Sequence, residues 1–148
     1  MADCVFCGIV AGSVPAFLVA SDPAGLAFLD VRPVFKGHVL VIPRPHVVTL
    51  PDLPPEDLPD YFGFVRRIAA AVPAALGAQG TFVAMNNVVS QSVPHLHTHV
   101  VPRTRGDGLK GFFWPRRKYA DDDEATGIAA AVGKEYTRLS VAETGRRE

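Results

Sequence analysis

Three histidines at alternating positions, His95, His97 and His99, form the densest group of titratable side chains in the sequence. Side chains of a β-strand alternate between its two faces, so a strand would present all three imidazoles on one face, with successive Cα atoms about 6 to 7 Å apart. Pro94 disfavours a helix entering this segment, and the valines at 100–101 favour a strand. The sequence therefore predicts a row of imidazoles on one side of a sheet.

Such a row is compatible with three kinds of role. It could be a half-exposed polar face, although crowding three imidazoles is unfavourable below their ordinary pKa of about 6.5 because each would become a cation. It could be a metal site, because imidazole is a good ligand for zinc, copper and iron. It could also supply a nucleophile and its acid or base, since a neutral imidazole can attack phosphorus and form a covalent intermediate.

The two cysteines, Cys4 and Cys7, are separated by two residues. Two cysteines are too few for a disulfide framework, and this spacing suits either half of a metal site or a redox pair. Composition alone leaves both possibilities open.

Length and charge limit the classes of partner. A chain of 148 residues fits a single domain, 1–148, with a real hydrophobic core. Lys and Arg number 15, as do Asp and Glu, so no broad field favours nucleic acid or an anionic membrane. The apolar stretches are too short to span a bilayer, and the N-terminus lacks a secretory signal. We therefore expect a cytoplasmic protein with no nucleic-acid or membrane partner.

The elements that must position the histidines can be predicted from hydrophobic spacing and turn residues. We expect a compact α+β domain with a core over about 4–119, because short strands surround one amphipathic helix. Strands are predicted over 17–21, 26–30, 38–42 and 81–86, and helices over 61–72 and 121–139, with a frayed tail after 141. The loop over 103–119 contains the basic cluster Arg116, Arg117 and Lys118 beside Trp114, which we interpret as a solvated segment or part of a pocket rim.

The segment from Gln91 to Arg103 resembles the signature of the histidine triad (HIT) superfamily of nucleotide hydrolases and transferases. The Cys-Val-Phe-Cys motif, the segments 26–30 and 37–43, and His46 follow in the order seen in its purine-nucleotide-binding branch. The resemblance implies a HIT-like α+β fold with an antiparallel sheet of about five strands, a central helix and a C-terminal helix. It also implies an AMP-type purine ligand and a homodimer in which two sheets pair edge to edge.

The same resemblance implies a role for each residue of the motifs. His97 corresponds to the nucleophile, which would form a covalent nucleotidyl-histidine at the α-phosphorus and whose other ring nitrogen is held by a backbone carbonyl. The remaining catalytic and nucleotide-binding positions are His99 and His38 beside the phosphate, Gln91 and Ser92 at phosphate or leaving-group oxygens, Asp30 at the ribose, and Asn86, or else Asn87, between ribose and phosphate. Asp30 could instead merely cap the end of a strand.

Cys4, Cys7, His46 and His95 resemble a zinc-binding set found in part of the family. Two thiolates and two imidazoles fill a tetrahedral site, so the zinc would be structural and no catalytic metal is expected. The alternative is a reduced cysteine pair without a ligand.

The resemblance thus implies a nucleotide hydrolase that acts at the α-phosphorus of a purine nucleoside 5′-phosphate derivative, a phosphoramidate or similar. The loop 87–90 departs from the family pattern, because many relatives have a longer approach there that contains glycine. A dinucleoside polyphosphate hydrolase and a non-catalytic nucleotide-binding or adaptor protein are the alternatives. A hydrolase that uses all three histidines as metal ligands is a weaker third.

Overall fold

The computed structural model describes residues 4–109 and 117–145. The chain divides into two compact units, Met1–Gly108 and Leu109–Glu148, and the first unit contains all the candidate site residues. Among the residues described, none of the helices combines the length and hydrophobicity needed to span a membrane.

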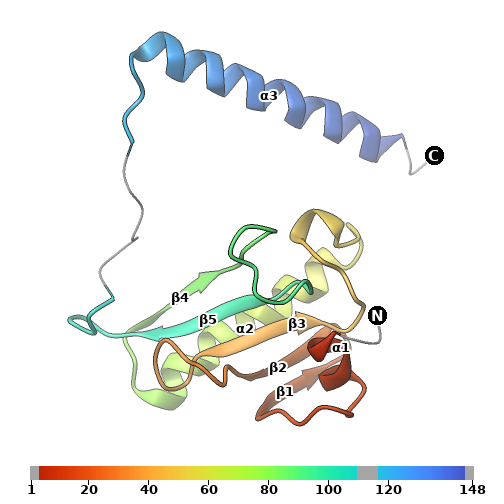
Figure 1. The fold of residues 1–148 in the computed structure, drawn as a ribbon, viewed down its shortest axis with the longest axis vertical. Helices are drawn as coiled ribbons and strands as arrows, with labels where there is room; N and C mark the ends of the chain where they lie inside the picture. Colours follow the sequence, from red (N-terminus) through yellow and green to blue (C-terminus); the bar gives the residue numbers. More distant parts are fainter. Residues whose placement is uncertain (1–3, 110–116, 146–148) are drawn as a thin grey trace. The chain divides into compact units, whose positions relative to one another are not determined.

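The first unit is built on a five-stranded antiparallel sheet with the strand order β1-β2-β3-β5-β4 (Figure 1). The strands are β1 (Leu18–Asp22), β2 (Gly25–Leu29), β3 (Val39–Pro43), β4 (Gly80–Ala84) and β5 (Thr98–Arg103). The predicted α+β class and the antiparallel sheet are confirmed. The predicted strands lie within two residues of the observed ones, apart from the one that carries the histidines.

The central strand β3 is buried on both faces, as its run of β-branched residues predicts. Val39 and Val41 belong to one hydrophobic cluster, which contains the inward face of helix α2. Leu40 and Ile42 point the other way and belong to a second cluster, which contains residues of helix α1. The alternation of strand side chains therefore gives the sheet one face for α2 and another for α1.

Helix α2 (Leu58–Leu76) covers the first face and is longer than the predicted 61–72. It starts early because Pro59 lies in its first turn, where a backbone N–H has no partner within the helix. It also continues through Pro73 and ends at Gly77, whose φ of 67° suits glycine. The hydroxyl of Tyr61 lies 3.0 Å from the Val41 carbonyl oxygen and 2.7 Å from the Thr98 hydroxyl, which links α2 to two strands.

Helix α1 (Val5–Val10) was not predicted. It has only six residues and no side-chain cap, so it lacks both the periodicity and the start signal of a predictable helix. Phe6 and Ile9 are its buried residues, and they pack with Phe28 and Leu40 on the second face of the sheet.

The predicted histidine strand is partly wrong, because β5 begins only at Thr98. His95 and His97 precede the strand in irregular backbone, where the Leu96 N–H donates to the Val47 carbonyl at 2.7 Å. His99 is thus the one histidine of the three on the strand, and Ala84 opposite it is the last paired residue of β4. Three imidazoles on a single face do not follow from this geometry.

The second unit contains helix α3 (Asp122–Thr144), which begins one residue later than predicted and continues past 141, where we expected a frayed tail. Asp121 accepts the Glu124 N–H at 2.8 Å, in keeping with the acidic start signal. Residues 110–116 lie outside the described part of the chain, and with them Trp114 and Arg116 of the predicted rim segment.

Candidate functional site

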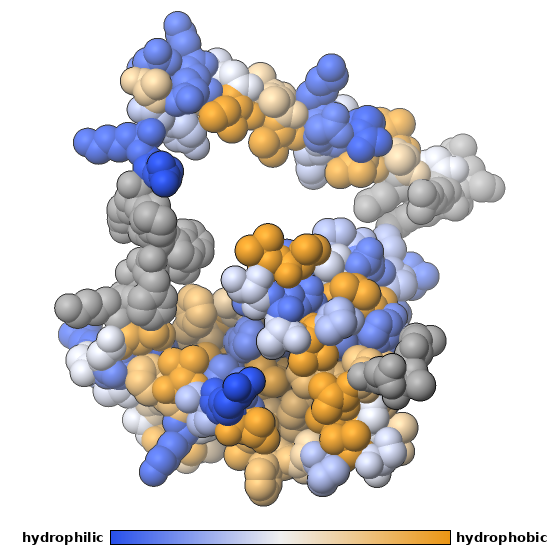
Figure 2. All heavy atoms as spheres, viewed as in Figure 1, coloured by the Kyte–Doolittle hydropathy of each residue, from blue (hydrophilic) through white to orange (hydrophobic). Residues whose placement is uncertain are grey.

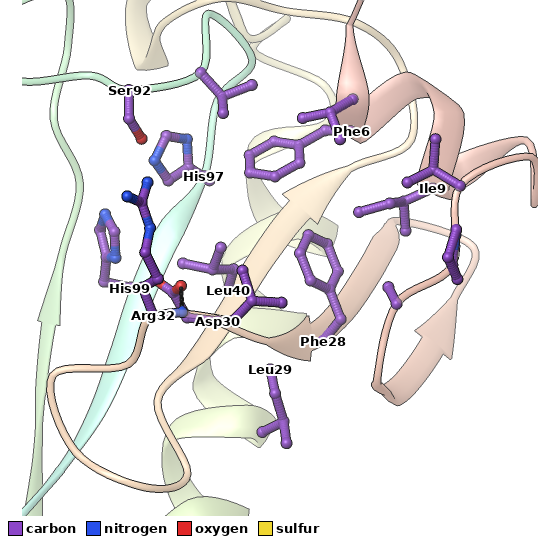
Figure 3. A pocket seen from close by; sticks show the side chains of 16 residues that line it. Phe6, Ile9, Phe28, Leu29, Asp30, Arg32, Leu40, Ser92, His97 and His99 are labelled. Atoms are coloured by element: carbon purple, nitrogen blue, oxygen red, sulfur yellow. Dashed lines mark hydrogen bonds between the residues drawn. The ribbon is translucent and has the colours of Figure 1, made fainter.

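A cavity of about 480 Å³ opens on the α1 side of the sheet (Figure 3). Phe6, Ile9, Phe28 and Leu40 form part of its apolar wall, and hydrophobic side chains gather over the region of α1 and β1 in Figure 2. Its polar lining is Asp30, Arg32, Ser92, His97 and His99. An apolar slot with a few polar groups at one end suits a ligand that joins a flat ring to a charged group.

His97 has a defined tautomer. Its Nδ1 lies 2.8 Å from the backbone carbonyl oxygen of His95, which can only accept, so Nδ1 carries the proton. The other nitrogen, Nε2, then has a free lone pair. The ring is almost fully buried yet lines the cavity, with the edge of Phe6 against it at 5.3 Å between ring centroids. His97 therefore offers an unprotonated nitrogen of fixed orientation to whatever occupies the cavity.

His99 and His38 form a hydrogen-bonded pair across two strands. The Val34 N–H donates to His38 Nδ1 at 3.1 Å, which leaves the proton of this ring on Nε2. That Nε2–H donates to His99 Nδ1 at 2.9 Å, so the proton of His99 lies on its own Nε2. His99 is thus a hydrogen-bond donor to the cavity that it lines. Asp30 lies 3.7 Å from His38 Nδ1, but this nitrogen holds no proton and the contact is no ion pair.

Burial keeps both of these rings neutral. It is the largest cause that lowers the pKa of His99 to about 4, and His97 and His38 lower it further. Burial also lowers the pKa of His38, against a smaller opposite effect of Asp30. Near pH 7 the His38 and His99 rings are therefore neutral, which agrees with the tautomers that their hydrogen bonds require.

Asp30 follows the end of β2 and lines the cavity. Its Oδ1 accepts the Arg32 N–H at 2.8 Å, which fixes the turn after the strand. Both sequence-based interpretations thus have a structural counterpart, because the carboxylate caps a turn and also faces the cavity with lone pairs to spare.

The amide side chains of the predicted phosphate region brace a loop instead of lining the cavity. Gln91 donates to the Val48 carbonyl at 2.6 Å and accepts the Val88 N–H. Asn86 donates to the Ser90 carbonyl at 3.3 Å, and Asn87 accepts the Leu50 N–H at 2.8 Å. Of the predicted residues in this segment, Ser92 lines the cavity.

This short loop is strained. Val88 has a φ of 70° and Ser90 a φ of 62°, a region that L-residues with a Cβ rarely adopt. At these positions many members of the family that the sequence resembles have a longer segment that contains glycine. The bracing by Gln91 and the two asparagines explains how the backbone is held there.

A second cluster brings together Cys4, Cys7, His46 and His95, whose ligand atoms all lie within 4.8 Å of one another. His95 Nδ1 is 3.6 Å from Cys4 Sγ and 3.7 Å from Cys7 Sγ, and His46 Nδ1 is 3.2 Å from Cys7 Sγ. Bond lengths of about 2.3 Å to sulfur and 2.1 Å to nitrogen place S and N about 3.6 Å apart around a tetrahedral zinc. The donor set therefore fits zinc.

His95 is oriented for this cluster and not for the cavity. Its Nε2 donates to the Pro43 carbonyl at 3.0 Å, so that its Nδ1 lone pair faces the sulfur atoms. A ligating histidine commonly has its second nitrogen fixed in this way. Burial, together with the Cys4 thiol, raises the pKa of the Cys7 thiol. The protonated form of the Cys7 thiol is thus favoured unless a cation compensates the charge of the thiolate.

Sequence reasoning missed most of the cavity lining, including Phe6, Phe28 and Arg32. Phe6 lies on the unpredicted helix α1, and Phe28 is one of several apolar residues in a strand that is buried throughout. Arg32 gave a weak signal, as a cation next to the predicted ribose residue Asp30.

Comparison with known proteins agrees with this arrangement. The family model described as HIT domain matches residues 11–106. A HIT-like protein of Mycobacterium tuberculosis is 43% identical and covers 84% of this chain and 88% of its own length. An adenosine 5′-monophosphoramidase of Schizosaccharomyces pombe is 35% identical over 76% of this chain and 84% of its own. An adenylylsulfatase of Arabidopsis thaliana is also 35% identical, over 93% of this chain and 71% of its own.

Solved structures show the same likeness. A protein of Streptococcus mutans has a TM-score of 0.83 at 36% identity, over 92% of this chain and 87% of its own. A zinc-bound histidine triad family protein of Mycobacterium smegmatis has a TM-score of 0.69 at 38% identity, over 93% and 98% of the two chains. With the family model spanning most of the first unit and relatives that are more than 30% identical over most of the chain, the chain belongs to the HIT family.

Proposed function

We propose that the protein is a nucleotide hydrolase that cleaves a purine nucleoside 5′-phosphate derivative at its α-phosphorus through a nucleotidyl-His97 intermediate. The observation that carries the proposal is the hydrogen bond from His97 Nδ1 to the His95 carbonyl, which leaves Nε2 as a free nucleophile in the cavity. Relatives named as an adenosine 5′-monophosphoramidase and an adenylylsulfatase support a hydrolase of this class.

Different parts of the cavity would bind different parts of the ligand. The purine ring would lie in the apolar part, against Phe6 and Phe28. The ribose hydroxyls would donate to the Asp30 carboxylate, which keeps lone pairs beyond the one that accepts the Arg32 N–H. The α-phosphate would then lie beside His97 and His99, where the His99 Nε2–H donates to a phosphate oxygen.

The remaining polar residues have proposed roles of two kinds. Ser92 would donate its hydroxyl to a phosphate or leaving-group oxygen, because it lines the cavity. Gln91 and Asn86 would act through the loop that they brace, unless the Gln91 amide exchanges the Val48 carbonyl for a phosphate oxygen. His38 positions His99 and fixes its tautomer.

The reaction would proceed in two displacements. In the first, the His97 Nε2 lone pair forms a bond to the α-phosphorus, and the bond to the leaving group breaks with its electron pair going to the leaving group, which takes up a proton from solvent if it is an amine. In the second, water attacks the same phosphorus, the P–N bond breaks and the nucleoside monophosphate leaves. The proton of the water passes to solvent, and His97 is restored.

Replacement of the nucleophile tests the proposal. His97→Ala should lower AMP release from adenosine 5′-phosphoramidate by at least about 10⁴-fold, because no other described residue offers a free nitrogen at this point of the cavity. Mass spectrometry of wild-type protein quenched during turnover should show a covalent nucleotidyl adduct on His97. A melting curve like that of the wild type controls for misfolding. Unchanged turnover in the variant would refute the mechanism.

The same measurements separate the alternatives. A non-catalytic nucleotide-binding or adaptor protein would bind AMP without forming an adduct. A dinucleoside polyphosphate hydrolase would be recognised by competition, because diadenosine polyphosphate would be the better substrate. A hydrolase with three metal-ligating histidines would form no adduct on His97 and would lose turnover in chelator even at saturating substrate, although His97 and His95 face different sites here.

We also propose that the Cys4, Cys7, His46 and His95 set holds a structural zinc, since its donor atoms fit the ion and leave no position open for substrate. The zinc-bound relative from Mycobacterium smegmatis supports this.

A further inference from the structure

Arg32 occupies the polar end of the cavity, next to the catalytic histidines. Its backbone N–H is held by Asp30 Oδ1 at 2.8 Å, so the turn that carries it is fixed. Its side chain is exposed and lines the same cavity as Ser92, His97 and His99. In Figure 3 the Arg32 guanidinium is drawn between the His97 and His99 rings, on the side of Ser92.

The charge of Arg32 is available to a ligand. Among the residues that line the cavity it is the one lysine or arginine, and Asp30 is the one carboxylate. Within the described part of the chain, no salt bridge includes the Arg32 guanidinium. Asp30 accepts only the backbone N–H of Arg32. A guanidinium with no described ion-pair partner in the cavity is a site for an anion.

The histidines limit which leaving groups the site can serve. An amine leaving group must gain a proton as its bond to phosphorus breaks. His99 has one proton to give, and its Nδ1 accepts the His38 N–H, so that full donation would leave an unfavourable imidazolate. A sulfate or phosphate leaving group departs as a stable anion and needs no proton. A nearby cation stabilises the negative charge of this leaving group, and Arg32 supplies that cation.

We infer that Arg32 is a specificity-determining residue that selects substrates whose leaving group departs as a sulfate or phosphate oxyanion over those that release an amine. The inference rests on the proposed function. For an adenylyl sulfate, the bond between His97 Nε2 and phosphorus forms while the P–O bond to sulfate breaks. The electron pair stays on sulfate, where the planar guanidinium can form two parallel hydrogen bonds. Both leaving-group classes occur in the names of relatives, which makes the choice a real one.

Neutral replacement of the guanidinium tests the inference. With adenosine 5′-phosphosulfate as substrate, Arg32→Gln should lower kcat/KM by about 10- to 100-fold, the value of one charge-assisted hydrogen-bond pair. With adenosine 5′-phosphoramidate the same variant should change kcat/KM by less than about threefold. Arg32→Lys should retain part of the preference for the sulfate leaving group, because it keeps the positive charge but cannot form the two parallel hydrogen bonds of a guanidinium.

Lys36→Gln is the matched control. Lys36 is an exposed cation of the same loop, it does not line the cavity, and its replacement removes the same charge. Both substrates should react with this variant as with the wild type. A loss equal to that of Arg32→Gln would show that long-range charge is responsible, and would overturn the inference.

The outcomes also separate the inference from the proposed function. If the wild type cleaves the phosphoramidate through His97 but Arg32→Gln affects both substrates equally, or neither, the inference is wrong and the proposed function stands. A wild type that prefers the phosphoramidate would likewise overturn the inference alone. If neither substrate reacts and no adduct forms on His97, both fail.

Discussion

Backbone carbonyls decide what each histidine of the triad can do. His95 donates to the Pro43 carbonyl and His97 to the carbonyl of His95, through different ring nitrogens. The first is thereby left with a free Nδ1, toward the cysteines, and the second with a free Nε2, toward the cavity. His99 accepts from His38 instead and faces the cavity as a donor. Three chemically identical side chains thus have three different hydrogen-bonding arrangements.

The lowered pKa of His99 predicts a pH-dependent stability. Its pKa in the folded protein, about 4, lies below the 6.5 of an ordinary histidine, so the unfolded chain binds more protons between these values. The free energy of unfolding should therefore fall as the pH is lowered from 6.5 toward 4, beyond the effect of the carboxylates. Urea denaturation at a series of pH values measures this.

His99→Gln is the comparison for that experiment, since it removes the titrating ring and leaves the other groups. Its free energy of unfolding should depend less steeply on pH in the same window. Parallel curves for the two proteins would contradict the expected neutral, buried state of His99.

The chemistry of these residues was more predictable than their geometry. Alternating histidines and the Cys-x-x-Cys spacing pointed to the side chains that could do chemistry, and the family resemblance grouped His46 and His95 with the cysteines. The resemblance also implied that a backbone carbonyl holds His97, but the tautomers of His95 and His99 could not be predicted, because they depend on where the Pro43 carbonyl and the His38 ring lie. Nor could the bracing role of Gln91 be predicted, because its acceptor belongs to Val48, far away in the sequence.

Helix α1 connects the two sites. Cys4 and Cys7 lie at its start, and Phe6 and Ile9 form part of the cavity wall. Its six residues are too few for a stable isolated helix, so its position depends on packing and on whatever holds the cysteines.

The elements that the sequence predicted well, β3 and α2, have long apolar patterns. Helix α1 has no such pattern. Strand β5 starts late because the Leu96 N–H donates to the Val47 carbonyl and not to a neighbouring strand.

Zinc removal should therefore destabilise the protein and weaken nucleotide binding together. Purified protein is expected to hold about one zinc per chain. EDTA should lower the melting temperature by about 5 to 15 °C and raise the Kd for AMP, because Phe6 and Ile9 lose their anchor.

Cys7→Ser provides the control, since it removes one ligand outside the cavity. This variant should melt at the same temperature with and without EDTA. Wild-type protein that contains well under one zinc per chain, or that is indifferent to EDTA, would leave the cysteines as a reduced pair.

The sheet of the first unit has β1 as one edge strand and β4 as the other. Exposed hydrophobic residues lie on both strands, Val19 on β1 and Val83 on β4. Apolar edge strands are usually covered in stable proteins. We therefore keep the prediction of a homodimer with edge-to-edge sheets.

Light scattering at micromolar concentration should give twice the 15.9 kDa of one chain. A lysine at the pairing edge would disrupt the dimer, so Val83→Lys and Val19→Lys should differ, and the variant at the free edge serves as the control. A monomer mass for the wild type would exclude the dimer.

Phe6 lies with its edge toward two rings at once, 5.9 Å from the centroid of His95 and 5.3 Å from that of His97. A single aromatic ring thus contacts both His95 of the cysteine cluster and His97 of the cavity. A fluorine atom introduced on that ring would report by ¹⁹F NMR on both neighbours in one spectrum. Metal binding at the cysteine cluster and nucleotide binding in the cavity would each shift the same resonance. Titrating the metal in the presence of the nucleotide, or the reverse, would show how each binding event affects the other.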